Sequence, residues 1–220
     1  YLHPKSARIP LGLIPIGTGN AFARELDLLP SAWSDAIDLL RRRHTRQVDV
    51  GFVESDTASF HFLNIVGMGF SVDAGLTAQK LKFFGTAAYT LATLWQVLKL
   101  KSYPMVVEIN GETLCSDNVF VTVSNSRYTG THFLIAPSAA IDDGLLDVTI
   151  LRKLKRRRLL RLFPTIYEGR HVAYEEVGAY KASKVNITSP AAMQLGPDGE
   201  FCGSSPVKIT CLPQDLTIFC

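Results

Sequence analysis

Cysteine is scarce in this sequence of 220 residues, and its positions suggest neither a metal site nor a disulfide framework. The cysteines include no C-x-x-C pair and stand at no ligand spacing from a histidine, which argues against zinc. We therefore expect the reduced thiols of a cytoplasmic protein. The serines carry no nucleophile-elbow motif, so a serine hydrolase is not indicated. The cysteines are Cys115, Cys202, Cys211 and Cys220.

A long hydrophobic run is also absent. The most apolar window, residues 83–98, is shorter than the roughly 20 residues that a membrane-spanning helix needs. Lys80, Lys82, Lys99 and Lys101 flank it, and the window predicts a buried or interfacial helix. No signal-peptide pattern opens the sequence. We expect a cytoplasmic protein whose association with membranes is peripheral.

Neither sign of charge is in large excess. The net charge of +3 is too small to indicate nucleic acid as a partner. The 47% of hydrophobic residues is ordinary for a globular protein with a real core. Basic residues do gather in one place, because residues 152–161 hold seven of the 23 lysines and arginines. This segment is either the solvated face of a helix or a surface that attracts anionic lipid headgroups, and the two interpretations are compatible.

The first part of the chain has helical periodicity. Residues 9–14 are apolar and of strand length, and Phe22, Leu26 and Leu29 then fall on one helical face that Pro30 ends. Ser31 is placed to cap a second helix, whose apolar face carries Trp33, Ile37 and Leu40. We place a domain boundary near Gln47, where strand patterns begin.

The rest of the chain has mostly strand patterns, with a helix over residues 155–167. Asn110-Gly111 between two apolar runs is a strong hairpin signal. We predict an α/β N-terminal piece over residues 1–47 and a mainly β, sandwich-like domain with inserted helices over residues 48–220. The predicted strands are 48–52, 60–66, 105–109, 112–114, 119–123, 145–151, 171–177, 182–188, 206–212 and 216–219.

Three short segments carry residues that could do chemistry. Gly17 and Gly19 lie at the predicted strand-to-helix turn, which suits either phosphate binding or an ordinary βα turn. Residues 142–147 hold three aspartates around a glycine, as in a hard-cation site or an Asp-Gly turn. Asp198-Gly199-Glu200 has the pattern of a hairpin tip.

The amino-acid sequences of these segments resemble motifs of the diacylglycerol kinase and sphingosine kinase family of lipid kinases. The family's Gly-Gly-Asp-Gly-Thr loop is not in this sequence, so the chain resembles the C-terminal two-thirds or so of such a kinase. Ala21 also stands where many members have aspartate. The matching stretches, in order, are Pro15-Ile16-Gly17-Thr18-Gly19-Asn20-Ala21-Phe22-Ala23-Arg24-Glu25-Leu26, Phe62-Leu63-Asn64-Ile65-Val66-Gly67-Met68-Gly69-Phe70, Ile141-Asp142-Asp143-Gly144-Leu145-Leu146-Asp147 and Asp198-Gly199-Glu200.

The resemblance implies an ATP-dependent lipid kinase that transfers the γ-phosphate of ATP to a hydroxyl of a diacylglycerol- or sphingoid-type lipid. The second domain would supply an apolar cleft for the acyl chains. Nucleotide contacts would come from the glycine segment, and Mg²⁺ would be held by an aspartate and a backbone carbonyl. By resemblance, the nucleotide-binding residues are Gly17, Thr18, Gly19 and Asn20, and the magnesium ligands are Asp143, the carbonyl of Leu145, and Asp142 as a further candidate.

Proton transfer would involve the last segment. A base must take the proton of the attacking hydroxyl. By resemblance Glu200 is the first choice, with Asp198 beside it, and the sequence does not decide between them.

Two other functions stay open at this point. One is a nucleotide kinase of the NAD kinase type, whose soluble acceptor needs no apolar cleft. The other is a non-catalytic lipid-binding module. We expect a lipid substrate and a membrane surface as partners and no nucleic acid, and a homodimer is compatible with the sequence. No motif identifies the particular lipid.

Overall fold

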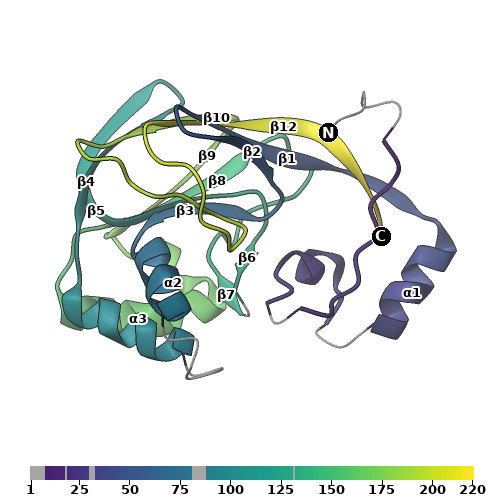
Figure 1. The fold of residues 1–220 in the computed structure, drawn as a ribbon, viewed down its shortest axis with the longest axis horizontal. Helices are drawn as coiled ribbons and strands as arrows, with labels where there is room; N and C mark the ends of the chain where they lie inside the picture. Colours follow the sequence, from purple (N-terminus) through teal and green to yellow (C-terminus); the bar gives the residue numbers. More distant parts are fainter. Residues whose placement is uncertain (1–7, 18, 30–32, 81–87, 131) are drawn as a thin grey trace.

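The computed structural model describes residues 8–17, 19–29, 33–80, 88–130 and 132–220. Figure 1 shows a small N-terminal part with helix α1 at one end of the molecule and a larger part built from strands. Thr18 and Ser31, two residues singled out in the sequence, lie outside the described residues.

The N-terminal part departs from the predicted strand and helix. The strand expected over residues 9–14 is reduced to one parallel bridge between Leu11 and Ile218. The helix expected from Phe22 to Leu29 is a short 3-10 helix, η2 (Phe22–Leu26), because Asp27 adopts a left-handed conformation with φ 54°. Leu28 is consequently buried, and Leu29, placed on the predicted apolar face, is exposed.

The second predicted helix is confirmed as α1 (Trp33–Arg42). Its buried residue is Ala36, while Trp33 is exposed, so its apolar face lies about one position away from the predicted one. Ala36 packs with Ala23 and Leu28 in a small cluster of its own. A neighbouring cluster packs Phe22 against Val48 and Ile218, so the N-terminal core adjoins the sheet.

The strands form one continuous antiparallel sheet. Its order is β11-β3-β5-β4-β10-β12-β1-β2, and β8 pairs with β5 and β9. The strands are β1 (Thr45–Ser55), β2 (Ser59–Phe62), β3 (Ile65–Gly69), β4 (Tyr103–Ile109), β5 (Glu112–Ser124), β8 (Leu146–Arg152), β9 (Val177–Ala182), β10 (Lys184–Thr188), β11 (Gly196–Pro197) and β12 (Val207–Phe219).

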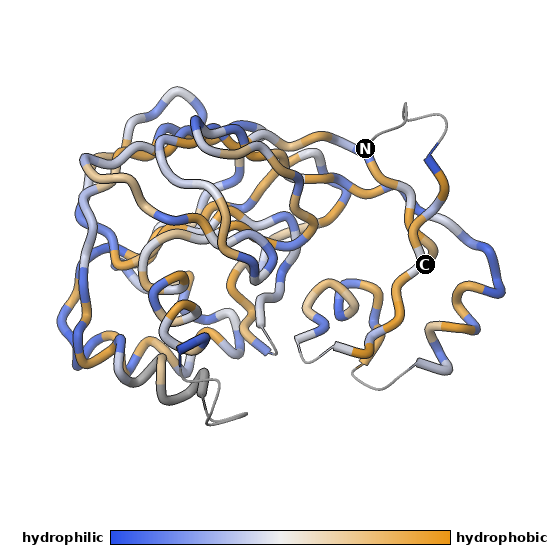
Figure 2. Tube along the Cα trace, viewed as in Figure 1, coloured by the Kyte–Doolittle hydropathy of each residue, from blue (hydrophilic) through white to orange (hydrophobic). Residues whose placement is uncertain are grey.

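Strand β5 joins the two layers of this sheet. Its first half pairs with β4, and its second half pairs with β3 and β8. The main hydrophobic core contains residues from both halves of the sheet, such as Val107, Val121, Val148 and Ile209. Figure 2 shows hydrophobic stretches along these strands and hydrophilic ones in many of the connections. The arrangement is the sandwich expected of alternating strands.

Helices cover one outer face of the sandwich. They are α2 (Phe70–Lys80), α3 (Ala88–Lys99), α4 (Arg156–Leu162) and the 3-10 segments η4 (Phe163–Glu168) and η5 (Arg170–Ala173). A second cluster of buried residues, including Val97, Phe120 and Leu162, joins them to β5 and β8. A small hairpin, β6 (Tyr128–Thr129) and β7 (Phe133–Leu134), stands beside this face. No helix among the described residues is long and apolar enough to span a bilayer.

Some of the local predictions in the β part are confirmed and others are wrong. The Asn110-Gly111 hairpin is confirmed, with φ of 53° and 84° at its tip. The strand predicted over residues 171–177 is wrong, because η5 occupies residues 170–173 and only Val177 begins a strand. The helix predicted over residues 155–167 is α-helical only to Leu162 and 3-10 beyond it, where Pro164 lacks the N–H that an α-helix would use. The strands predicted over residues 206–212 and 216–219 are the single strand β12.

Candidate active site

The Asp198-Gly199-Glu200 turn is fastened to the connection between β2 and β3. The Asp198 carboxylate accepts hydrogen bonds from the backbone N–H groups of Leu63 (2.9 Å), Asn64 (3.0 Å) and Ile65 (2.9 Å). In return, the Asp198 N–H donates to the carbonyl of Ile65 at 2.9 Å. Two segments whose resemblance to lipid kinases was noted separately are thus one structural unit.

This bonding gives Asp198 a positioning role. The residue as a whole is exposed, but its carboxylate is turned under the backbone of residues 63–65. Loss of water there raises the pKa of Asp198, and the three N–H donors oppose that rise. An aspartate held by three backbone donors fixes the turn that carries Glu200.

Glu200 has a different environment. It is exposed, and its carboxylate has no hydrogen bond or ion pair within the described part of the chain. Its backbone N–H donates to Pro197 O at 2.7 Å, which closes the turn. Gly199, with φ 94°, has open space where a side chain would stand. The turn therefore presents one engaged carboxylate and one free carboxylate.

A buried polar loop after β5 was not predicted from the sequence. The Asn64 carbonyl accepts the N–H groups of Asn125 (2.9 Å) and Ser126 (3.3 Å), and the Ser126 hydroxyl donates to the Asn64 side chain. Asn125 Nδ2 donates to the carbonyls of Leu63 (3.0 Å) and Asp49 (2.9 Å). Asn125 and Ser126 are fully buried. The only sequence signal was a polar run directly after an alternating strand.

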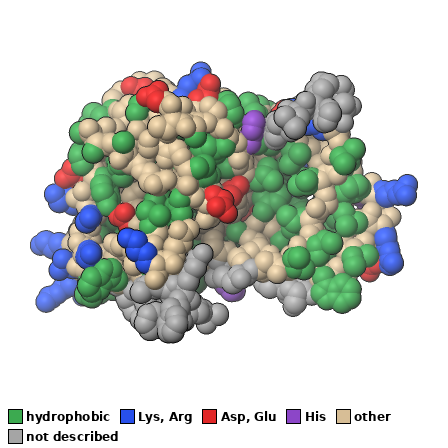
Figure 3. All heavy atoms as spheres, viewed as in Figure 1, with side chains coloured by type: hydrophobic (Ala, Val, Ile, Leu, Met, Phe, Trp, Pro, Cys, Tyr) green, Lys and Arg blue, Asp and Glu red, His purple; other side chains and the backbone are tan. Residues whose placement is uncertain are grey.

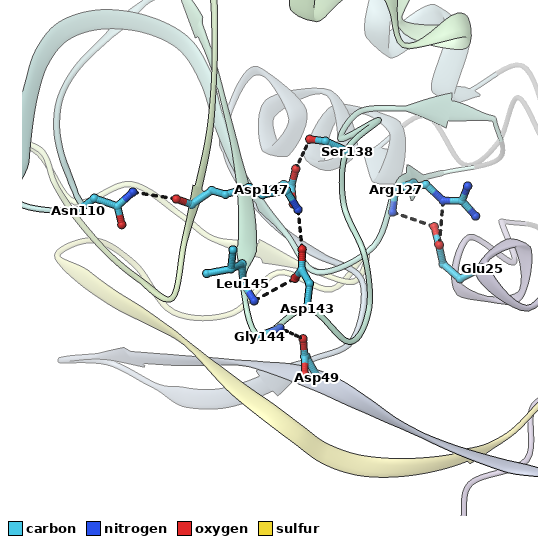
Figure 4. Close-up of polar contacts among 10 residues, drawn as sticks. Glu25, Asp49, Asn110, Arg127, Ser138, Asp143, Gly144, Leu145 and Asp147 are labelled. Atoms are coloured by element: carbon cyan, nitrogen blue, oxygen red, sulfur yellow. Dashed lines mark hydrogen bonds and ion pairs between the residues drawn. The ribbon is translucent and has the colours of Figure 1, made fainter.

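The same loop reaches the glycine segment through Arg127. Glu25 of η2 accepts the Arg127 backbone N–H at Oε1 (2.8 Å) and its guanidinium Nε at Oε2 (3.0 Å), as Figure 4 shows. Burial would lower the pKa of Arg127, and the bonded Glu25 carboxylate outweighs that effect, so the pKa is raised. The Glu25–Arg127 pair therefore ties the N-terminal part to the centre of the β part.

The glycine segment is shaped by Asn20. This residue has a positive φ of 48°, and its side chain accepts the Gly17 N–H (3.0 Å) and donates to the carbonyls of Pro15 (3.3 Å) and Gly17 (2.5 Å). A Cβ on Gly19 would lie 3.2 Å from the carbonyl oxygen of Gly130, so the segment passes close to the β6–β7 hairpin. The helix that follows is a 3-10 helix of five residues. Phosphate binding at this segment stays a prediction, and it rests on the loop of residues 17–20 and not on the short helix that follows.

The aspartate-rich segment forms a turn organised by ion pairs. The Lys181 ammonium lies 2.7 Å from Asp143 Oδ2 and 3.0 Å from Asp147 Oδ2. Asp143 Oδ1 also accepts the Leu145 N–H at 3.0 Å, and Ser138 donates to Asp147 at 2.5 Å (Figure 4). Burial would lower the pKa of Lys181, but the two carboxylates outweigh it and raise the pKa.

Asp49 holds this turn through a hydrogen bond to its backbone. This residue was not identified from the sequence. It is fully buried in β1. Its carboxylate accepts the N–H groups of Gly144 (2.6 Å) and Gln214 (2.7 Å), which lie far apart in the chain. The signal was a lone aspartate between Val48 and Val50, but its partners could not be read from spacing.

Comparison with known proteins identifies the family to which this arrangement belongs. A family profile described as the YegS C-terminal NAD kinase beta sandwich-like domain matches residues 64–220, and that of the diacylglycerol kinase catalytic domain matches residues 1–53. The diacylglycerol kinase of Mycobacterium tuberculosis is 33% identical over 213 residues, which are 96% of this chain and 69% of that protein. That of Staphylococcus carnosus is 28% identical over 219 residues, or 99% of this chain and 69% of that protein. This chain belongs to the diacylglycerol kinase and YegS-like family of lipid kinases.

The fold of this family member agrees with a solved relative. A crystal structure from Bacillus anthracis, assigned as a diacylglycerol kinase, superposes with a TM-score of 0.76 at 26% identity, covering 96% of this chain and 70% of that one. The predicted family and the sandwich-like fold class are confirmed. The relatives are named diacylglycerol kinases, which supports a kinase-type transferase.

In this structure, the aspartates predicted by resemblance to bind magnesium are engaged by other groups. Asp142 is paired with Arg46, whose Nη2 is 2.6 Å from Asp142 Oδ2. Both oxygens of Asp143 already have donors, and one of these is the ammonium of Lys181. Within the described residues, no group of three or more His, Cys, Asp or Glu side chains could hold a metal ion. The turn is suited to the internal cation of Lys181, and the magnesium ligands stay a prediction.

The expected apolar cleft for acyl chains is not provided by either of two surface pockets. One pocket of about 240 Å³ is lined by Leu114, Cys115 and Arg152 among others, and one of about 270 Å³ lies beside α1. Both mix polar and apolar walls, and neither is lined by Asp198, Glu200 or Asn64.

Proposed function

We propose that this chain provides the acceptor side of an ATP-dependent lipid kinase, which transfers the γ-phosphate of ATP to a lipid hydroxyl. One observation carries the proposal: a continuous set of contacts links the glycine segment to the Asp198-Gly199-Glu200 turn. The set runs from Glu25 through Arg127 and the buried Asn125-Ser126 loop to Asn64 and Asp198. Residues proposed to meet the nucleotide and residues proposed to meet the acceptor are therefore held by one framework.

The proposed chemistry is the transfer of a phosphoryl group from ATP to a lipid hydroxyl, with both substrates held in fixed positions. Phosphoryl transfer depends mainly on positioning and on charge stabilisation, together with a group that receives the proton of the acceptor hydroxyl. Glu200 is proposed as that group because its carboxylate is exposed and free. Asp198 holds the turn. Gly17, Thr18, Gly19 and Asn20 are proposed to lie against the phosphates of ATP, and the Mg²⁺ that accompanies ATP is proposed as part of the substrate.

The acceptor is proposed to be a diacylglycerol- or sphingoid-type lipid. Relatives across this length are named diacylglycerol kinases, which favours a diacylglycerol. The sandwich domain is also described by its likeness to NAD kinase, so a soluble nucleotide acceptor is the second candidate.

The decisive experiment changes Glu200→Gln in the natural protein that contains these residues. The substitution keeps the size of the side chain and removes the base, so kcat should fall by about 10² to 10⁴-fold, the range of general base catalysis. KM and thermal stability should change little, because the side chain is exposed. The matched control is Glu112→Gln, another exposed glutamate directly after a glycine at a turn, which should leave kcat unchanged.

The outcome separates the candidate functions. Turnover of Glu200→Gln close to that of Glu112→Gln would remove Glu200 from the mechanism. Dispersed diacylglycerol, a sphingoid base and NAD are offered in parallel as acceptors. Phosphorylation of NAD alone would overturn the lipid kinase proposal, and phosphorylation of none would favour a binding module.

A further inference from the structure

Helices α3 and α4 leave apolar side chains uncovered at one end of the molecule. Trp95 is 50% exposed, Leu98 is 63% exposed and Leu160 is 53% exposed. The opposite sides of the same helices are buried, since Val97 and Leu159 belong to one hydrophobic cluster. The exposed residues are therefore the outer faces of two helices that are already anchored, and nothing within the described chain covers them.

Positive charge surrounds these apolar residues. Residues 88–101 and 152–163 contain no aspartate or glutamate. Lys153 and Arg158 are paired with Asp117 and Glu176. Arg152 is half-buried and donates to the carbonyl of Glu175. The remaining cations are exposed and have no ion pair within the described chain: Lys99, Lys101, Lys155, Arg156, Arg157 and Arg161. We call α3, α4 and these residues the basic end, and Figure 3 shows lysines and arginines gathered at the end of the molecule where α3 lies.

The combination favours one kind of partner. A wholly polar acidic partner would pair with the cations but would leave the exposed Trp95 and Leu98 facing water. A bilayer interface takes both, because tryptophan prefers the headgroup level and cations are attracted to anionic headgroups. Lys99 Nζ lies 4.9 Å from the centre of the Trp95 ring, which places one cation directly beside the aromatic group. Nucleic acid would need stacking aromatics interleaved with the arginines, and α4 has none.

We propose that the basic end docks on a membrane that exposes anionic phospholipid, with Trp95, Leu98 and Leu160 entering the interface. The arginines of α4 then lie against the headgroups. The inference takes its choice of a bilayer from the proposed lipid kinase function, because an insoluble acceptor must be met at a membrane. Docking itself needs no turnover, so the two proposals are tested separately.

The first experiment uses vesicles and a charge-matched control at the other end of the molecule. The 220-residue chain is sedimented with vesicles of phosphatidylcholine, alone or mixed in equal parts with phosphatidylglycerol. The test variant is Arg156→Gln/Arg157→Gln/Arg161→Gln, and the control is Arg41→Gln/Arg42→Gln/Arg43→Gln. All six arginines are exposed, and both variants remove the same charge.

The expected result follows from the charge count. Each basic residue near an anionic surface contributes about fivefold to affinity, so the test variant should bind mixed vesicles on the order of 100-fold more weakly. The control should keep wild-type affinity. Binding of the wild type should fall with added salt, and pure phosphatidylcholine should hold it poorly. Equal losses for the two variants would overturn the assignment of the basic end.

The second experiment uses the chain's only two tryptophans. Trp33→Phe leaves Trp95 as the reporter, and Trp95→Phe leaves Trp33, which is similarly exposed on α1. With mixed vesicles, the emission of Trp95 should shift to shorter wavelength as the ring leaves water, while that of Trp33 should not change. A shift of Trp33 alone, or tighter binding to duplex DNA than to mixed vesicles, would overturn the proposal.

One experiment distinguishes failure of the proposed function from failure of the docking proposal. If the basic end docks as proposed, the triple variant of α4 in the natural protein should still phosphorylate detergent-dispersed lipid and lose activity only toward lipid in vesicles. Loss with both presentations would assign these arginines to the reaction instead of to the membrane.

Discussion

At the scale of single residues, Lys181 holds the aspartate-rich turn together. It bridges Asp143 and Asp147, and its carbonyl accepts Asn110 Nδ2 at 2.8 Å. Lys181→Met should lower the free energy of unfolding by about 1–3 kcal/mol, because two neighbouring carboxylates lose their shared cation. Urea denaturation measures the loss. Lys184→Met, an exposed lysine nearby without an ion pair in the described chain, should be neutral.

Magnesium gives this variant a second readout. With the ammonium gone, Asp143 and Asp147 are free to take a divalent ion, so Mg²⁺ should stabilise Lys181→Met by mass action. The wild type should gain little, since its carboxylates already have a cation. If Mg²⁺ stabilised the wild type as strongly, the metal would be bound in the presence of Lys181 and the original magnesium prediction would be favoured.

Asp198 and Glu200 should separate as positioning and reacting residues. In Asp198→Asn one oxygen is replaced by an NH₂ group that faces backbone N–H donors, which should cost about 1–3 kcal/mol of stability. Turnover of the natural protein should fall as well, because the turn that carries Glu200 loosens. Thermal unfolding of Asp198→Asn beside Glu200→Gln checks this. An Asp198→Asn protein of unchanged stability but lost turnover would give the proton-accepting role to Asp198.

At the scale of elements, η5 contains a buried histidine that should make stability depend on pH. His171 is fully buried, and its Nε2 lies 3.0 Å from the carbonyl oxygen of Ile135. Burial lowers its pKa from 6.5, although the bond to Ile135 opposes this. As the pH falls, the unfolded chain therefore binds the proton at a higher pH than the folded protein does. The stabilising contribution is complete above pH 6.5 and is lost as the pH falls toward the lower pKa of the folded state.

Urea midpoints at pH about 7.5 and about 5.5 test this effect. The contribution is at most about 1.4 kcal/mol per pH unit between the two pKa values. His171→Gln removes the titration while keeping an amide that can donate to Ile135, so its stability should depend less on pH. His61, whose pKa is also lowered, remains in both proteins and cancels in the comparison. Identical pH slopes would show that His171 is not the source.

The turns at Gly111 and Gly199 allow the effect of a glycine on stability to be separated from its effect on turnover. Gly111 and Gly199 have φ of 84° and 94°, and a Cβ at either position would meet nothing within 4 Å. Alanine at each should therefore cost about 1–2 kcal/mol through the backbone alone. Only Gly199→Ala should also reduce turnover of the natural protein, since it lies between Asp198 and Glu200. Equal turnover of the two variants would mean that the 198–200 turn need not be held rigidly.

Elements with a local cause were predictable from the sequence, and those set by distant partners were not. The hairpin at Asn110-Gly111 follows from its own φ requirement, so it was found. The segment 9–14 pairs with Ile218 at one residue only, which no local pattern reveals. The site shows the same division. Asp198 and Glu200 were visible as a motif, but the partners of Asp49, Asn125 and Lys181 come from remote parts of the chain.

At the scale of the whole molecule, the N-terminal part is joined to the sandwich at several places. They include the bridge between Leu11 and β12, the packing of Phe22 against Val48 and Ile218, and the ion pair between Glu25 and Arg127. The side chain of Glu25 is only 5% exposed, so this pair is shielded from water on one side. The glycine segment therefore has a fixed place relative to Asn64 and Asp198, which a nucleotide site shared between the two parts would require.

A fixed glycine segment should nevertheless bind ATP weakly by itself. The 220 residues contain no Gly-Gly-Asp-Gly-Thr loop, and phosphate sites usually gather several backbone N–H groups around the anion. In the described residues, the Gly17 N–H is already bonded to Asn20. Isothermal titration of the chain with Mg-ATP should therefore show binding weaker than micromolar, and the chain alone should not turn over lipid. Asn20→Ala should abolish what binding remains, because the turn loses the side chain that shapes it. Micromolar or tighter binding that Asn20→Ala leaves intact would place the nucleotide elsewhere on this chain.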